Sequence, residues 1–292
     1  MAFDILPLSH AIGAEITGLD LNAPLNCGTI ADIRAAWLDH NVLLFRDQHL
    51  TPENHIAFSR EFGTLDDHRS RPDEQLPGYP EIFMVTNLPR DDGRPSRTRN
   101  TGRQWHTDFS YTKRPAMGSL LHCHEIPEKG GDTLFANMTM AWDSLSDGLK
   151  TLLSPLEAVH DAANIGNFRT RDQVEVQIIK DNNPPIVQPV MRQHPETGKP
   201  ALYVTESATT HFVGMTAEES RPILKYLFKQ STRDEFIYRH RWRVGDLIMW
   251  DNRCTLHRAL MDYSHESDRR HMLRTTILGE ASGILVSVSR RG

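Results

Sequence analysis

The stretch QWHTDFS, residues 104–110, places a histidine and an aspartate two positions apart, at His106 and Asp108. On a β-strand, residues two apart project from the same face of the sheet, so both side chains would point together into a barrel. One imidazole and one carboxylate are two of the three ligands in the facial triad that holds non-haem Fe(II) and leaves coordination positions open. Isolated His-x-Asp pairs are common as surface or hydrogen-bonded residues, so a metal site depends on a third ligand elsewhere in the chain.

A second stretch far downstream contains a candidate for that ligand. Residues 245–258 read GDLIMWDNRCTLHR, which predicts a strand, a polar turn and then His257. A histidine so distant along the chain would meet His106 and Asp108 if a closed β-barrel brought separate strands together. A hydrogen-bonded core histidine is the alternative interpretation of His257.

Two arginines follow His257 at the start of a predicted strand. Arg270 and Arg274 are four residues apart, so on a strand they share a face, with their Cα atoms about 13 Å apart. Buried guanidinium groups need anions to pair with them. The two arginines therefore indicate an anion-binding site, with ion pairs to Asp or Glu at the rim of the barrel as the alternative.

The composition is that of an ordinary globular protein, for which we expect no nucleic-acid or membrane partner. The 292 residues are 38% hydrophobic and 24% charged, with a formal net charge of −5. No positive excess favours a nucleic-acid partner, and no apolar run approaches the roughly 20 residues of a membrane span. The N-terminus has no basic region followed by an apolar one, and the three cysteines are too few and scattered for a disulfide scaffold. We therefore expect a cytoplasmic protein.

Short apolar runs separated by glycine and polar turns predict a mainly β protein with helical insertions. Strands are predicted at 13–21, 41–45, 81–85, 116–126, 130–135, 201–204, 236–242, 247–250 and 272–278, and helices at 30–40, 51–63, 139–156 and 216–230. This pattern is typical of a double-sheet jelly-roll barrel, a cupin-like double-stranded β-helix core with α+β content overall. We expect one domain over residues 1–292, with 66–103 as an active-site lid loop and 160–200 as an insertion between barrel strands.

Four motifs together resemble those of the taurine dioxygenase family, whose members include dichlorophenoxyacetate dioxygenase and alkylsulfatases. They are His106-Thr107-Asp108, Gly130-Gly131-Asp132-Thr133, Trp250-Asp251-Asn252-Arg253 followed by His257, and Arg269-Arg270 followed by Arg274. The motifs occur in the family's order, within a resemblance that runs from about residue 13 to residue 280. It implies a double-stranded β-helix and an Fe(II)- and 2-oxoglutarate-dependent dioxygenase. By this resemblance His106, Asp108 and His257 would bind the iron. Arg270, with Thr133, would hold the distal carboxylate of 2-oxoglutarate.

The resemblance also implies the reaction and the kind of substrate. Such enzymes use O2 to decarboxylate 2-oxoglutarate to succinate and CO2 while they hydroxylate a small organic anion, here an aryloxyalkanoate, a sulfonate or an alkyl sulfate. Arg274 would face the anionic group of this substrate, and His68 falls near a substrate-contacting histidine of the family. Family members are often dimers or tetramers, so a homo-oligomer is expected.

Two other functions are compatible with the same residues. A cupin-like metalloenzyme that needs no 2-oxoglutarate would use the three metal ligands but would have no use for Arg270 and Thr133. A jelly-roll binding protein would recognise anions without turnover. The metalloenzyme would bind no 2-oxoglutarate, and the binding protein would release no succinate.

Several polar residues near these motifs have simpler structural interpretations. A strand-forming role is the alternative for Thr133, and a position on the loop surface is the alternative for His68. Asp246 and Asp251 are expected to cap turns and strand ends instead of binding metal. The pair His122 and His124 also shares a strand face, but no carboxylate follows it, so packing or surface roles are expected.

Overall fold

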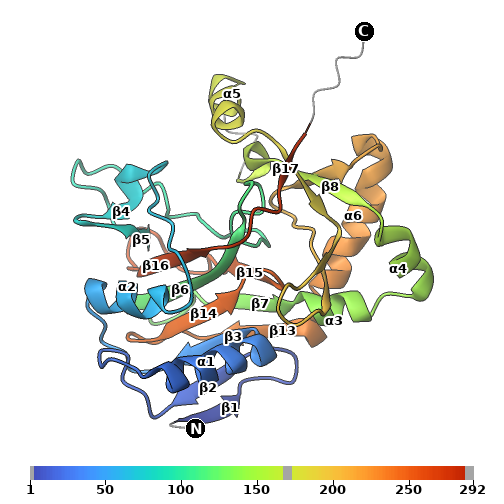
Figure 1. Cartoon of the computed structure of the whole chain (residues 1–292). Coiled ribbons are helices and arrows are strands. Elements are labelled where there is room, and N and C mark those ends of the chain that lie inside the picture. Colours follow the sequence, from blue (N-terminus) through green and yellow to red (C-terminus); the bar gives the residue numbers. More distant parts are fainter. Residues whose placement is uncertain (1–2, 167–172, 287–292) are drawn as a thin grey trace.

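The computed structural model describes residues 3–166 and 173–286, and its main feature is an eight-stranded sheet (Figure 1). From one edge to the other, the strands are β1 (Asp4–Pro7), β2 (Ala14–Thr17), β3 (Val42–Phe45), β14 (Leu247–Asp251), β6 (Ala116–Glu125), β16 (His271–Leu278), β5 (Tyr79–Thr86) and β4 (Gln75–Leu76). β2 and β3 are parallel, and the other neighbouring pairs are antiparallel. Strands from the beginning and the end of the chain therefore alternate at the centre of one sheet.

Two helices cover the outer face of this sheet. α1 (Cys27–His40) packs against β3 and β14, and α2 (Pro52–Arg60) packs against β16 and β5. α2 begins as its sequence predicts, because Thr51 Oγ1 accepts the Asn54 N–H and proline occupies the first turn. Trp37 of α1 and Phe58 of α2 belong to one buried apolar cluster with the outward side chains of the sheet. Burial of such large apolar side chains contributes about 1.5–3 kcal/mol each.

A three-stranded antiparallel sheet packs against the inner face. It consists of β13 (Ile237–His240), β7 (Thr133–Asn137) and β15 (Thr255–Ala259), with β7 in the middle. Phe135 of β7 is buried in one cluster with Leu44, Phe83 and Trp250 of the large sheet. Two sheets with a core between them confirm the predicted mainly β class with helical insertions.

The remaining strands form two smaller sheets. β8 (Glu157–His160), β9 (Ile186–Pro189), β12 (Thr209–Phe212) and β17 (Ile284–Leu285) make a four-stranded sheet, and β10 (Met191–Gln193) pairs with β11 (Pro200–Leu202). The segment 160–200 therefore contributes paired strands as well as turns. It also carries α5 (Gln173–Asn182), which Figure 1 shows at the edge of the molecule beyond β17.

The other helices are α3 (Met138–Asp143), α4 (Asp147–Leu153) and α6 (Ala217–Ser231), with short 3-10 turns at η1 (Pro72–Glu74), η2 (Ala162–Asn164) and η4 (Asp234–Phe236). The helical segment predicted over 139–156 is two short helices, because α3 ends at Asp143 and Ser146 caps the start of α4 by accepting the Leu149 N–H. The helix predicted over 216–230 is confirmed as α6, and it begins with a capping box in which Thr216 and Glu219 each accept the other's backbone N–H. Within the described ranges, no helix is long and apolar enough to cross a membrane.

Four histidines form a cluster where α2 meets the outer face of the sheet. The rings of His55 and His122 are 5.9 Å apart, those of His122 and His124 are 4.6 Å apart, and His271 lies 5.7 Å beyond His124. His122 is buried and its Nε2 bonds to the Gln48 carbonyl oxygen at 2.6 Å. The packing role expected for His122 and His124 is confirmed.

We expect this histidine cluster to make the fold sensitive to acid. Burial, followed by the charges of His122 and His124, lowers the pKa of His55 from 6.5 to about 3, and burial lowers that of His124 to about 4. Below the ordinary pKa the unfolded chain binds protons that the folded chain does not bind. The stability contributed by neutral His55 is therefore complete above pH 6.5 and is lost as the pH falls towards 3, by about 1.4 kcal/mol per pH unit.

The variant His55→Leu tests this pH dependence. Between about pH 6 and pH 4, the slope of its unfolding free energy against pH should be smaller than that of the wild type by about 1.4 kcal/mol per unit. Urea unfolding at a series of pH values measures this slope. His10→Leu, the same change at an exposed position, should leave the slope unchanged. Equal slopes in the wild type and His55→Leu would show that His55 is not held neutral.

Candidate active site

His106, Asp108 and His257 converge on one point between the sheets. The Nε2 atom of His106 lies 4.0 Å from Asp108 Oδ1, and the Nε2 atom of His257 lies 4.0 Å from Asp108 Oδ2. The two imidazole rings have centroids 4.0 Å apart, and the potential ligand atoms all lie within 4.8 Å of one another. The three distant side chains are therefore brought together as the sequence predicts.

The local geometry around His106 differs from the predicted strand. His106 pairs with His257 by a single antiparallel bridge, in which each residue donates its backbone N–H to the other's carbonyl oxygen, at 3.1 and 2.8 Å. The chain then turns, and Phe109 adopts a left-handed backbone with φ of 57°. His106 lies in a bridge and Asp108 lies in the turn that follows it. The expectation that both side chains project from the same face of one strand is therefore wrong.

Both histidines have the protonation state that metal binding requires. His106 Nδ1 lies 2.8 Å from the Gln104 carbonyl oxygen, which only accepts hydrogen bonds, so Nδ1 carries the hydrogen and Nε2 presents its lone pair to the cluster. His257 is held by packing, with the Trp250 ring at 4.8 Å and the Phe135 ring stacked at 6.2 Å. Burial lowers the pKa of both imidazoles, which keeps them neutral.

Asp108 is buried and ionised. Burial opposes its charge, but the Arg274 guanidinium, together with the hydrogen bond from Ser119, outweighs burial and holds the carboxyl pKa well below its usual range. Arg274 Nη1 donates to Oδ1 at 2.9 Å, and Ser119 Oγ donates to Oδ2 at 2.7 Å. Two neutral imidazoles and one carboxylate are the donor set of a non-haem Fe(II) site, so the side chains fit that metal.

A second group of potential ligands, His194, Asp251 and Cys254, is already satisfied by hydrogen bonds. His194 Nδ1 accepts the N–H groups of Glu196 and Thr197, so its Nε2 carries a hydrogen and donates to Asp251 at 3.0 Å. Asp251 also accepts from the backbone N–H and guanidinium of the residue two positions on. The turn-capping role expected for Asp251 is confirmed. Asp246 likewise caps a turn by accepting the Arg243 N–H.

Arg270 is a buried cation without a carboxylate partner in the described part of the chain. It lies directly before β16, is 4% exposed, and donates from Nε to the Gly131 carbonyl oxygen at 3.2 Å. Gly131 has φ of +75°, a backbone conformation that favours glycine, and a Cβ there would crowd Ile126 at 3.2 Å. Burial lowers the pKa of Arg270, so the charged form needs an anion. The ion pair to Asp or Glu considered as an alternative does not form at Arg270 within the described residues, whereas Arg274 does pair with a carboxylate, that of Asp108, at 2.9 Å.

Thr133 lies on the same face of the small sheet as His257. In the register of β7 and β15, Phe135 is opposite His257 and Thr133 is opposite Ala259. Thr133 is therefore two residues, or about 7 Å, along β7 from Phe135, the residue opposite His257. Trp242 Nε1 donates to Thr133 Oγ1 at 2.9 Å. Because an indole N–H only donates, the hydroxyl hydrogen of Thr133 is left to donate to another group. Sequence reasoning missed Trp242, which no pattern distinguishes from a core residue.

His68 is buried, so the alternative of a surface position on the loop is wrong. Its Nδ1 lies 2.9 Å from Asp66 Oδ2, and its ring packs 5.2 Å from Phe83 and 6.4 Å from Phe109. His68 does not line the cavity beside the three candidate ligands. Contact between His68 and the substrate stays a prediction.

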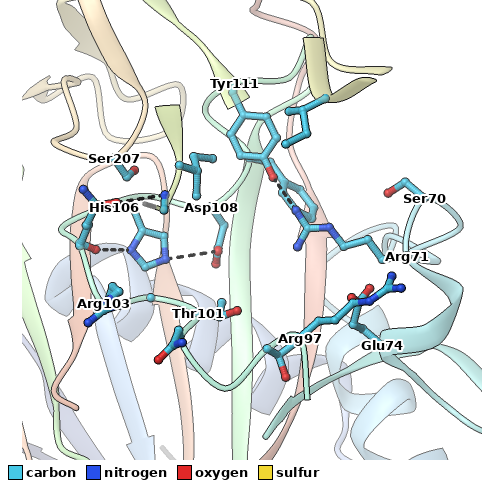
Figure 2. Close-up of a pocket in the computed structure, with 18 of the residues that line it drawn as sticks. Ser70, Arg71, Glu74, Arg97, Thr101, Arg103, His106, Asp108, Tyr111 and Ser207 are labelled. Carbon is cyan, nitrogen blue, oxygen red and sulfur yellow. Dashed lines mark hydrogen bonds and ion pairs between the residues drawn. The ribbon is translucent and has the colours of Figure 1, made fainter. Parts of the chain in front are cut away.

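A cavity of about 770 Å³ opens next to the three candidate ligands (Figure 2). One part of its wall is cationic, with Arg71, Arg97, Arg103 and Arg274. Another part is apolar, formed by three isoleucines at 165, 178 and 179. Residues from both 66–103 and 160–200 line the cavity. It can therefore hold a small molecule that has an anionic group and an apolar body.

Arg71 and Tyr111 form the wall opposite His106 and Asp108, as Figure 2 shows. Arg71 Nη2 lies 3.4 Å from the Tyr111 hydroxyl, and the guanidinium forms no ion pair with any carboxylate in residues 3–166 or 173–286. A second cation is therefore available to an anionic ligand. Sequence reasoning missed both residues, because single polar residues in irregular loops carry no periodic signal.

Known proteins resemble this chain over nearly its whole length. Residues 4–276 match the family described as "Taurine catabolism dioxygenase TauD, TfdA family". The chain is 34% identical over 285 residues to the alpha-ketoglutarate-dependent 2,4-dichlorophenoxyacetate dioxygenase of Cupriavidus pinatubonensis, which covers 94% of this chain and 97% of that protein. It is 35% identical over 269 residues to the (S)-phenoxypropionate/alpha-ketoglutarate-dioxygenase of Sphingobium herbicidovorans, covering 88% and 89%. The crystal structure of AAD-2 in complex with Mn(II) and N-oxalylglycine matches with a TM-score of 0.84 at 32% identity, over 97% of this chain and 99% of that one.

Proposed function

This chain belongs to the TauD, TfdA family of dioxygenases, and we propose on that basis that His106, Asp108 and His257 bind its Fe(II). The enzyme is a 2-oxoglutarate-dependent dioxygenase with the jelly-roll core that its sequence predicts. When bound, Fe(II) supplies the O2 chemistry that couples substrate hydroxylation to the conversion of 2-oxoglutarate into succinate and CO2. The convergence of two neutral imidazoles and one ionised carboxylate is the observation that supports these ligands.

We propose that Arg270 and Thr133 hold the distal carboxylate of 2-oxoglutarate. Arg270 is buried without a carboxylate partner among the described residues, so a bound carboxylate would supply the anion it needs. The free hydroxyl hydrogen of Thr133 would donate to the same group. Thr133 lies about 7 Å along the small sheet from the level of His257, a separation that suits the two ends of a five-carbon dicarboxylate. A metalloenzyme without 2-oxoglutarate, or an anion-binding protein without turnover, would have no use for this arrangement.

For the primary substrate we propose an aryloxyalkanoate, a sulfonate or an alkyl sulfate. Arg274 would bind the anionic group, since its guanidinium is buried and lines the cavity, and only its Nη1 is bonded to Asp108 among the described residues. Arg71, on the opposite wall, would attract the same anion into the cavity. The isoleucine wall would pack against the apolar body. Two relatives named for phenoxyalkanoates make this class the first to test.

Succinate release tests this function directly. The purified enzyme, with Fe(II), ascorbate and 2-oxoglutarate, is incubated in air with phenoxyacetates, phenoxypropionates, alkyl sulfonates and alkyl sulfates. We expect succinate release to rise at least about tenfold over the substrate-free rate with one of these classes, because the substrate couples oxidation to productive turnover. The His106→Ala variant is the control and should release none. The substrate assignment is wrong if every class leaves the rate at its substrate-free value.

A further inference from the structure

A buried polar network lies behind Asp108, on the side away from the cavity. Its centre is Asn252, 1% exposed, in the turn that follows β14, and its other members are Ser119 of β6 and Thr107. Ser119 is completely buried on the inner face of the large sheet. Thr107 lines the cavity, but Asn252 and Ser119 do not, so neither of them can contact a substrate there. Burying a polar side chain costs free energy unless it is hydrogen-bonded, so the polarity of these two residues needs another explanation.

The direction of each hydrogen bond at Asn252 is fixed by donors that cannot accept. The Asp108 backbone N–H and the Trp250 Nε1–H both point to one side-chain atom of Asn252, at 3.1 and 3.0 Å, so that atom is the carbonyl Oδ1. The amide Nδ2 therefore faces Ser119 Oγ, 3.0 Å away, and donates to it. Because Ser119 Oγ accepts this hydrogen, its own hydrogen is free to go to Asp108 Oδ2, at 2.7 Å.

The network therefore ends on a carboxylate oxygen of Asp108 and also holds the backbone of the same residue. Thr107 adds a third restraint, because its hydroxyl donates to the Asn252 backbone oxygen at 2.6 Å. Asp108 precedes the left-handed Phe109, so its backbone is not held by a strand ladder. Without the Ser119 bond to Oδ2, the carboxylate would be held by Arg274 at Oδ1 alone among the described residues, and it could turn about that contact into several orientations.

We infer that Asn252 and Ser119 are positioning residues that fix the orientation of the Asp108 carboxylate before metal binds. The inference rests on the proposed function, since it concerns the aspartate ligand of that site. Their effect is on metal affinity: a carboxylate held in one orientation loses less freedom on binding, and outer partners of metal ligands typically change affinity by about 10–100-fold.

The test compares Mn(II) affinity in Ser119→Ala and Ser59→Ala, with free Mn(II) measured by electron paramagnetic resonance in the apoprotein. Ser59 is a matched control, because it is equally buried and its hydroxyl also makes two hydrogen bonds, to the His55 carbonyl oxygen and to Thr275. It lies on α2, on the outer side of the sheet. Both variants lose buried hydrogen bonds, so both should lower the melting temperature by similar amounts.

We expect Ser119→Ala to raise the dissociation constant for Mn(II) about tenfold or more, and Ser59→Ala to change it less than about twofold. Ser119→Thr keeps the hydroxyl and should restore most of the affinity. Unchanged affinity in Ser119→Ala, or an equal loss in Ser59→Ala, would overturn the positioning role while leaving the metal site intact. If the wild type binds no Mn(II), or binds it as well after His106→Ala, the metal site itself is wrong and the inference fails with it.

Discussion

Replacing His106 by alanine is expected to abolish succinate release and to weaken metal binding by more than about 100-fold. The variant keeps two of the three ligands, Asp108 and His257, which are too few to occupy one face of the metal's coordination sphere. The protein should stay folded, because the His106 side chain hydrogen-bonds only to the Gln104 carbonyl oxygen among the described residues. Its backbone bridge to His257 needs no side chain. Metal affinity is measured by titration with Mn(II), and folding is measured by thermal melting of the apoprotein.

His124→Ala is the matched control for this variant. It removes the same imidazole from a partly buried position, but in the histidine cluster on the outer face of the sheet. Metal affinity and succinate release should therefore match the wild type. If His124→Ala loses metal as His106→Ala does, the loss reflects a general loss of structure. If His106→Ala keeps full activity, His106 is not a ligand.

Replacing Arg270 by alanine is expected to raise the KM for 2-oxoglutarate by two to three orders of magnitude. The variant leaves a buried carboxylate without its counter-charge, which costs about 3–5 kcal/mol, and every 1.4 kcal/mol is a factor of ten. The melting temperature of the apoprotein should be kept or raised, because the variant removes a buried cation that has no carboxylate partner in the described residues. Succinate release at varied 2-oxoglutarate measures the first effect, and thermal melting measures the second.

Arg274→Ala provides the comparison, since it removes the same side chain four residues along. We expect it to raise the KM for the primary substrate far more than the KM for 2-oxoglutarate, because Arg274 lines the cavity next to Asp108. The two variants should therefore show opposite patterns. Equal effects of either variant on both KM values would contradict the division of roles between Arg270 and Arg274.

The sequence predicts the convergence of the three ligands better than their local geometry. His106, Asp108 and His257 are found by residue type and order, because few side chains can bind Fe(II) and their motifs are short. The strand expected at His106 is a single bridge, because the left-handed Phe109 turns the chain away from His257. Such a turn is set by tertiary contacts, here the hydrogen bond that the Asp108 backbone N–H donates to Asn252 Oδ1, and it leaves no periodic pattern in the sequence.

Residues that act through other residues are the ones sequence reasoning misses. In the sequence, Trp242 looks like a core aromatic residue. It follows β13, and its N–H can reach Thr133 because the pairing of β13 with β7 places His240 opposite Thr133. Ser119 interrupts an apolar strand without any sign that its hydroxyl meets a carboxylate. Arg71 lies among many charged residues of an irregular loop. Its position across the cavity depends on how that loop folds over the sheet.

We propose that His106, Asp108 and His257 together would bind one Fe(II), at a site that would also take 2-oxoglutarate. Anaerobic titration of the apoprotein with Fe(II) and 2-oxoglutarate tests it through the visible charge-transfer band that a 2-oxo acid produces when it chelates ferrous iron. We predict that the band saturates at one equivalent of each in the wild type and is absent in His106→Ala. A wild type without the band, or a His106→Ala variant with an undiminished band, would contradict the account.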